Sequence, residues 1–283
     1  MVTEHSLPKN KKAGFEHYVS QEGKKARCSP TVPKQGANPL GGVASITNAA
    51  RRVIELTPKT EAFAQAYKKG RMGIYAVNLT ESKTLTYVII YGHTGGRIGP
   101  KEAAATNILI QIAHAEMEAQ PKGPKVIAGD LNADPTNLPH LQDMVNDQGW
   151  TDLGAKANLW GGIPEEHTCL GHNAKDSTRN DYALANSHCL PLVKGLRVLH
   201  HECFLVHSVL QFKLEGSTVV TAYQAPKKPK SLYELLRNKC LEKWKEEDPT
   251  KAEDAEEQNS PEKVWMETES SVHQVFDDQL KIR

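Results

Sequence analysis

The sequence predicts an α/β fold in which two packed, mixed β-sheets are flanked by helices. Short runs of β-branched and aromatic residues recur between residues 27 and 214, as expected for strands. A longer segment of good helix formers, residues 103–119, interrupts them and carries Ile108, Ile110 and Ile112. Strands that continue on both sides of a helical segment indicate sheets covered by helices.

The expected strands are apolar runs bounded by Gly, Pro or polar turns. They are residues 27–32, 42–46, 73–79, 85–91, 125–128, 182–185, 196–199 and 206–214. A polar turn around Glu81 and Ser82 separates the third run from the fourth and predicts a hairpin. Amphipathic spacing predicts further helices at residues 8–19 and 138–145.

The composition changes after about Tyr223, so we expect one domain at residues 1–222 and a tail at residues 223–283. The tail begins with a basic linker and a short helix, and it continues as an acidic, flexible stretch. A late helix containing Trp265 and Phe276 would need another protein or a downstream domain to bury these side chains.

Composition argues against a membrane or secreted protein. No apolar run approaches the roughly 20 residues of a membrane span, and the N-terminus lacks a charged segment followed by an apolar core. The five scattered cysteines form no C-x-x-C pair, which favours an intracellular location, cytoplasmic or nuclear. The net charge is only +1, so nucleic-acid binding would depend on local basic clusters. The alternative is that these clusters are ordinary solvated surface.

Residues 125–134, with the sequence KVIAGDLNAD, are the most informative stretch of the chain. A buried strand ends here in Gly129, and Asp130 and Asn132 follow two residues apart, on one side of an extended backbone. A carboxylate can bind a hard cation or orient water, and an amide can donate to a phosphate oxygen. The alternative is an Asx turn that caps a helix beginning near Pro135.

Three further residues suit phosphodiester chemistry. Asp181 and His207 stand at the starts of two later strands, and a carboxylate can hold and charge an imidazole beside a phosphate. Tyr91 ends an earlier strand, and Arg97 follows it in a Gly-rich loop. Each has an ordinary structural alternative, such as a half-buried histidine or a packing aromatic.

Taken together and in this order, the motifs resemble the endonuclease/exonuclease/phosphatase superfamily of metal-dependent phosphodiesterases, over roughly residues 1–216. The matching segments are Gly41 to Ala44, Gly129 to Asn132 and Arg179 to Tyr182, and the loop from Tyr91 to Arg97 is most similar to retrotransposon endonuclease domains. The resemblance implies a four-layer α/β sandwich and a DNA endonuclease.

The resemblance also implies roles for individual residues. Asp130 would activate the attacking water, Asn132 would hold the phosphate, and Asp181 would orient the catalytic His207. Tyr91, Arg97 and Arg179 would contact the phosphate or the strand, and Glu4 would bind the metal ion, Mg²⁺ or Mn²⁺.

Two departures from the family pattern suggest a truncated and partly degenerate member. The family's first strand, which carries an active-site Asn, has no counterpart before Glu4, and Val206 stands where the family has a metal-binding Asp. The sequence therefore leaves two main hypotheses: a DNA endonuclease derived from a retroelement, or a non-catalytic fragment with weak nucleic-acid binding. A small-molecule phosphatase is a third, less favoured hypothesis.

Overall fold

The computed structural model describes residues 1–34, 39–49, 53–80, 83–170, 176–200 and 206–215. The chain divides into two units, Met1–Thr221 and Ala222–Arg283, and all of these residues belong to the first. The linker, helices and acidic tail expected at residues 223–283 lie outside the described residues. No helix in the described part is long and apolar enough to cross a membrane.

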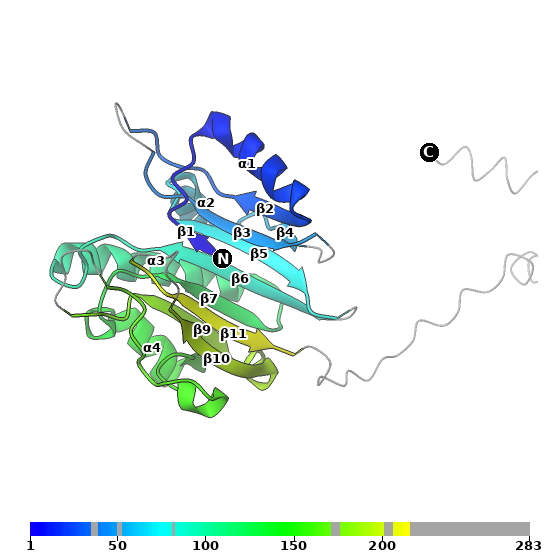
Figure 1. The fold of residues 1–283 in the computed structure, drawn as a ribbon. Coiled ribbons are helices and arrows are strands. Elements are labelled where there is room, and N and C mark those ends of the chain that lie inside the picture. Colours follow the sequence, from blue (N-terminus) through cyan, green and yellow to red (C-terminus); the bar gives the residue numbers. More distant parts are fainter. Residues whose placement is uncertain (35–38, 50–52, 81–82, 171–175, 201–205, 216–283) are drawn as a thin grey trace, which may run out of the picture. The chain divides into compact units, whose positions relative to one another are not determined.

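The centre of the fold is a six-stranded mixed sheet (Figure 1). Only β6 and β7 are parallel, and every other neighbouring pair is antiparallel. From edge to edge, its strands are β4 (Val53–Glu55), β5 (Met72–Asn78), β6 (Thr84–Tyr91), β7 (Lys125–Asp130), β9 (Asp181–Asn186) and β8 (Trp150–Asp152). The predicted hairpin is the β5–β6 pair.

The side chains of β6 alternate between the two faces of this sheet. Tyr87 and Ile89 belong to one apolar cluster, while Val88 and Ile90 belong to the cluster on the opposite face. Burial on both faces is typical of a central strand and explains the nearly continuous apolar sequence of residues 85–91.

Helices α2 (Glu61–Lys68), α3 (Pro100–Ala119) and α4 (Pro139–Asp147) cover one face (Figure 1). Their buried side chains, such as Phe63 and Ile110, share one cluster with the sheet. The described loops also contain three short 3₁₀ helices: Pro135–Asn137, Ala157–Trp160 and Leu190–Leu192.

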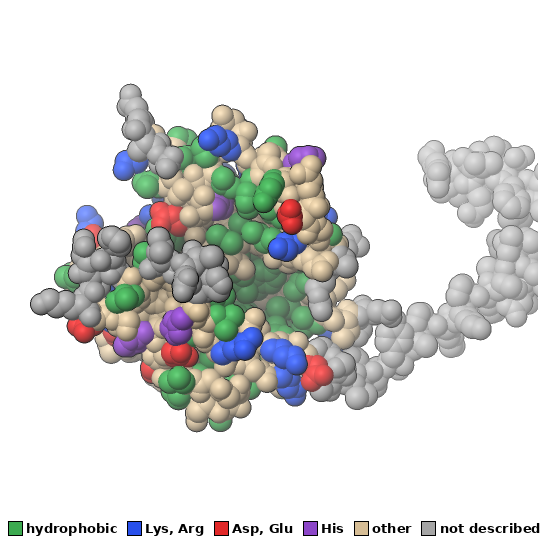
Figure 2. All heavy atoms as spheres, viewed as in Figure 1, with side chains coloured by type: hydrophobic (Ala, Val, Ile, Leu, Met, Phe, Trp, Pro, Cys, Tyr) green, Lys and Arg blue, Asp and Glu red, His purple; other side chains and the backbone are tan. Residues whose placement is uncertain are grey.

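Two small antiparallel sheets form the second layer. One has the order β1 (Val2–Thr3), β3 (Val43–Asn48), β2 (Lys24–Cys28), and the other pairs β10 (Val193–Leu199) with β11 (Val209–Leu214). Their apolar side chains share the second cluster with the opposite face of the central sheet. Figure 2 shows hydrophobic side chains exposed in a hollow of this face.

Helix α1 (Lys9–Gln21) packs on the outer side of the three-stranded sheet through Phe15 and Val19. The layers are therefore helices, sheet, small sheets and helix, and the predicted four-layer α/β sandwich is confirmed. Two predicted boundaries were wrong: the strand expected at residues 27–32 runs over Lys24–Cys28, and the last strand begins at Val209 rather than residue 206.

A buried carboxylate joins α3 to the start of α2. Glu116 is fully buried, and it accepts hydrogen bonds from the backbone N–H groups of Lys59 and Thr60, both at 2.8 Å, and from the Thr60 hydroxyl at 2.8 Å. The Gln120 amide donates a further bond of 2.7 Å. Burial alone would raise the pKa of Glu116, but these hydrogen bonds hold it below its ordinary value.

We expect Glu116→Ala to lower the free energy of unfolding by roughly 3 kcal/mol, because it leaves several buried donors without an acceptor. Urea denaturation measures the change. Glu118→Ala is the matched control, since Glu118 lies on the same helix with a largely exposed side chain. Equal urea midpoints for the two variants would show that the Glu116 hydrogen bonds do not stabilise the fold.

Candidate catalytic site

Strand register places three of the predicted residues in one row. Tyr91 at the end of β6 is paired with Asp130 at the end of β7, and Asp130 is paired in turn with Asp181 at the start of β9. Residues that pair directly across neighbouring strands project to the same face of a sheet. The central sheet therefore presents a phenol and two carboxylates side by side at one end of these three strands.

Two glycines allow the ends of β6 and β7 to approach each other closely. Gly129 has φ +153°, and a Cβ atom there would collide with the Ile90 carbonyl oxygen of the neighbouring strand. A Cβ atom on Gly92 would collide with the Leu131 carbonyl oxygen. Any larger residue at either position would push the ends of β6 and β7 apart.

Asp130 and Asn132 form a tight local pair. The Asn132 backbone N–H donates to Asp130 Oδ1 at 3.0 Å, and Asn132 Nδ2 donates to Asp130 Oδ2 at 2.8 Å. Asn132 has φ +52°, a left-handed conformation that Asn tolerates better than most residues. This is an Asx turn, but the helix start near Pro135 is capped by Asp134 instead.

His207 is held between the two aspartates of the row. Its Nδ1 lies 2.9 Å from Asp181 Oδ2, so the expected hydrogen bond is present, and its Nε2 lies 3.9 Å from Asp130 Oδ2. The ring is 38% exposed and is therefore accessible to a ligand. Asp130, Asn132, Asp181 and His207 thus meet at one place, as the order of the motifs predicts.

The electrostatics of this group are unusual. Burial raises the pKa of Asp130 to about 7, and the nearby charge of Asp181 acts in the same direction. The hydrogen bond to Asp181 raises the pKa of His207, although burial opposes that shift. The site therefore combines a carboxyl that exchanges a proton near neutral pH with an imidazole whose protonated form is stabilised by Asp181.

Tyr91 and Glu4 lie together beside this group. Burial, followed by a hydrogen bond to Glu4, raises the pKa of the Tyr91 hydroxyl to about 12. Glu4 follows β1 directly, and its negative charge also raises the pKa of His207. The structure thus brings the predicted metal-binding Glu4 to the same end of the sheet as Asp130.

The two predicted substrate-binding arginines occupy different settings. Arg97 is one-third exposed, and it donates to the Arg179 carbonyl oxygen at 3.2 Å and pairs with Asp134 at 3.3 Å. Arg179 is buried over the Tyr182 ring, and its guanidinium binds both Asp152 and Glu165. This geometry favours a structural role for Arg179, while a phosphate contact remains open to Arg97.

Two neighbours of the site were not anticipated from the sequence. The Thr168 hydroxyl accepts the backbone N–H groups of Asn180 and Asp181 at 3.1 and 3.0 Å, which fixes the start of β9. Cys169 pairs with His207 in a β-bridge, and its Sγ lies 3.8 Å from His207 Nε2. No sequence pattern marks these residues, because their roles depend on contacts between distant segments.

Among the residues that the structure describes, no three or more His, Cys, Asp or Glu side chains are grouped closely enough to hold a metal ion. Val206, where the family pattern has an aspartate, is partly exposed next to His207 and adds no ligand. The Glu4 carboxylate, which accepts a hydrogen bond from Tyr91, is a donor beside the site. Mg²⁺ is commonly held by one or two carboxylates, with water and substrate phosphate supplying the remaining oxygens, and Glu4 fits that mode.

Comparison with solved structures identifies the fold. The chain is similar to a 3'-5' exonuclease (NExo) from Neisseria meningitidis, with a TM-score of 0.55 and 16% identity over 75% of this chain and 87% of the exonuclease. A structure described as the 3' phosphatase NExo from Neisseria bound to product DNA hairpin gives a TM-score of 0.54, also at 16% identity, with the same coverage of both chains.

An AP endonuclease from Archaeoglobus fulgidus has a TM-score of 0.52 and 13% identity, over 74% of this chain and 84% of the endonuclease. No protein-family model and no curated protein matches the sequence. The structural matches show that the described domain shares its fold with these enzymes, in agreement with the fold that the sequence resemblance implies.

The raised pKa of Asp130 gives stability a definite pH dependence. Between pH 3.8 and about 7 the folded state holds a proton on Asp130 that the unfolded state has lost, so stability falls as pH rises through this interval. We expect Asp130→Asn to remove this part of the decline, as measured by thermal melts at a series of pH values. The exposed Asp147→Asn is the control, and identical pH profiles for the two variants would contradict the shift.

Asp181→Asn should lower the pKa of His207, because it removes the largest cause of the upward shift while burial remains. NMR titration of the His207 ring nitrogens measures this directly. The exposed Asp176→Asn should leave the titration unchanged. An unaltered His207 titration in the Asp181 variant would show that their hydrogen bond does not form in solution.

Proposed function

We propose that this chain hydrolyses phosphodiester bonds and that its substrate is DNA. The observation that carries the proposal is a buried Asp130 with a pKa near 7 beside His207, whose imidazole is held by Asp181. One carboxyl can then accept a proton while the imidazolium stabilises negative charge. Hydrolysis of a phosphodiester by water needs both functions.

In the proposed reaction a water molecule attacks the phosphorus atom, and Asp130 takes up the proton that this water loses. A new P–O bond forms as the bond to the leaving oxygen breaks. Asp181 holds Nδ1 of His207 and stabilises its protonated form, and the Nε2–H donates a hydrogen bond to a phosphoryl oxygen, where negative charge accumulates. The second N–H of the Asn132 amide is available to hold the phosphate, since only one is used by Asp130.

A divalent cation fits this site. Glu4 would hold Mg²⁺ or Mn²⁺ together with oxygens of the substrate, and the ion would neutralise charge on the phosphoryl and leaving oxygens. Tyr91 positions Glu4 through its hydroxyl, and Arg97 has solvent access for contact with a second phosphate.

DNA is favoured as the substrate for two reasons. Similar folds occur in an exonuclease and an AP endonuclease, and one matched structure is described as bound to a product DNA hairpin. The loop from Tyr91 to Arg97 resembles retroelement endonuclease domains, so we also propose a retroelement origin. The small number of metal ligands favours a second candidate, a domain that binds DNA without cutting it.

We expect cleavage of supercoiled plasmid DNA that requires Mg²⁺ or Mn²⁺ and stops on addition of EDTA. Asp130→Asn and His207→Ala should each lower kcat by about 10²–10⁴, the usual effect of removing an acid–base or electrostatic group. The rate should rise as Asp130 loses its proton near pH 7. Loss of the His207 proton, which the raised pKa of the ring opposes, should lower the rate.

Gel analysis of nicked plasmid measures the rates, and Asp147→Asn serves as a variant outside the site. DNA binding without cleavage by the wild-type protein would favour the second candidate. Equal, metal-independent nicking by wild type and Asp130→Asn would reveal a contaminating nuclease and remove the support for catalysis.

A further inference from the structure

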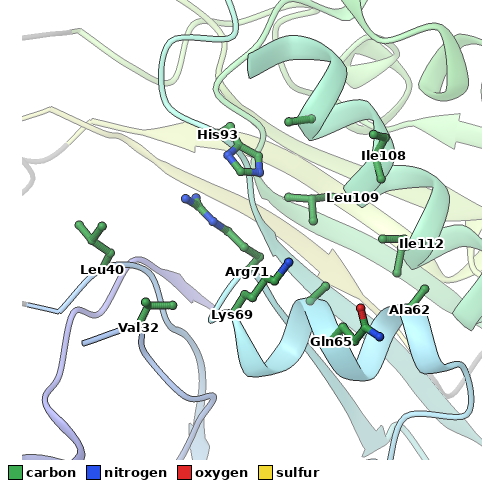
Figure 3. Close-up of a pocket in the computed structure, with 12 residues that line it drawn as sticks. Val32, Leu40, Ala62, Gln65, Lys69, Arg71, His93, Ile108, Leu109 and Ile112 are labelled. Carbon is green, nitrogen blue, oxygen red and sulfur yellow. The ribbon is translucent and has the colours of Figure 1, made fainter. Parts of the chain in front are cut away.

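A groove of about 540 Å³ runs between α2 and α3, outside the catalytic group (Figure 3). Ala66 of α2 and Ile108, Leu109 and Ile112 of α3 form its apolar walls. Ile108 is 53% exposed, although it lies on a helix with ample buried surface. The volume falls in the usual range of small-ligand sites, about 300–1,000 Å³.

One end of the groove is cationic. Lys69 and Arg71 gather there beside His93, as Figure 3 shows, and none of the described residues that line the groove is acidic. Burial lowers the pKa of His93, and the charge of Arg71 lowers it further, against an opposite effect of Glu102. An anion at this end would relieve the crowding of positive charge.

This cationic end adjoins the catalytic site. The Arg71 guanidinium carbon lies 4.9 Å from the centre of the Tyr91 ring, and Arg71 Nη1 donates to the Gly92 carbonyl oxygen at 2.9 Å. Tyr91 belongs to the row that contains Asp130 and Asp181. An anion bound by Arg71 would therefore be a close neighbour of the phosphate under attack.

We infer that the α2–α3 groove holds the nucleotide next to the scissile bond, with its phosphate on Lys69, Arg71 and His93 and its base against Ile108 and Leu109. The inference rests on the proposed function and specifies its substrate as a polynucleotide strand rather than a small phosphate ester. A strand repeats its phosphates at regular intervals, so a second anion site beside the first fits a polymer. A long-chain carboxylate is the alternative occupant, since its acyl chain would suit the apolar walls. It would not explain why the groove lies beside the catalytic site.

The groove also implies tolerance of base identity. Among the described residues that line the apolar half, Gln65 is the one uncharged polar side chain, and its amide Nε2 donates to Glu61 at 3.1 Å. Sequence is recognised through hydrogen bonds to base edges, whereas apolar contact with a base face is open to all four bases. Exchange of the base at this position should change binding less than twofold.

The test compares two substrates of the full-length chain. Lys69→Glu should raise KM for a short single-stranded oligonucleotide roughly tenfold, because it reverses a charge at a phosphate contact. It should leave hydrolysis of bis(p-nitrophenyl) phosphate, which has no flanking nucleotide, unchanged. Lys68→Glu is the matched control, since Lys68 is the neighbouring exposed residue and does not line the groove. Equal losses in both variants would overturn the inference.

A binding measurement keeps the groove testable if the chain does not cut DNA. Fluorescence anisotropy of a labelled oligonucleotide should show weaker binding for Lys69→Glu and for Ile108→Asp, but not for Gln111→Asp on the exposed side of α3. Bound oligonucleotide should also raise the pKa of His93 in an NMR titration. If the wild-type protein binds dodecanoate but not the oligonucleotide, the inference is overturned in favour of an acyl ligand. Failure of bis(p-nitrophenyl) phosphate hydrolysis alone would count against catalysis and not against the groove.

Discussion

The register of three adjacent strands is the constraint on which the candidate site depends. The pairing of β6 with β7 and of β7 with β9 brings Tyr91, Asp130 and Asp181 into line, although they are distant in sequence. That register requires close approach of β6 and β7, which the missing side chains of Gly92 and Gly129 permit. A shift of one residue would turn every one of these side chains to the other face. The alternation of side chains along the strands buries Ile89 and Ile90 on opposite faces of the sheet and also sets the face on which the site residues lie. The register therefore specifies the row and the two apolar clusters together.

The same row concentrates unfavourable charge. Asp130 is buried close to Asp181, and its raised pKa records the free energy needed to ionise it there. His207 offsets part of this by lying between the two carboxylates. Beneath them, Arg179 is buried against Asp152 and Glu165 and fixes the loop that leads into β9. A structure selected only for stability would not keep such an arrangement, and strained or charged groups of this kind are often found at functional sites.

Much of the fold could be predicted because its strongest elements are encoded locally. Residues 73–79 and 85–91 carry continuous β-forming sequence around a polar turn, and residues 103–119 have helical periodicity, so the hairpin and α3 were predicted correctly. Strands β4 and β8 have three residues each, too few for a periodic pattern, and α2 depends on the Thr60 cap and on Glu116 from another helix. The meeting of Asp130, Asp181 and His207 was predictable from motif order. The ion pairs of Arg179 with Asp152 and Glu165 could not be predicted, because no local sequence pattern indicates an ion pair between distant segments.

The split second layer has a consequence for the behaviour of the protein in solution. Within the described residues, β1 pairs only with β3 and β11 pairs only with β10, so each small sheet has a strand edge with no described neighbour. Free edges offer backbone donors and acceptors to strands of other molecules and so promote association between chains. Strand β11 alternates exposed residues with partly buried apolar ones, and Val209 is among the exposed. Its exposed Lys213 is a charge of the kind that opposes such pairing. Self-association through these edges would vary with protein concentration and ionic strength, and the charge of Lys213 would oppose it at the β11 edge.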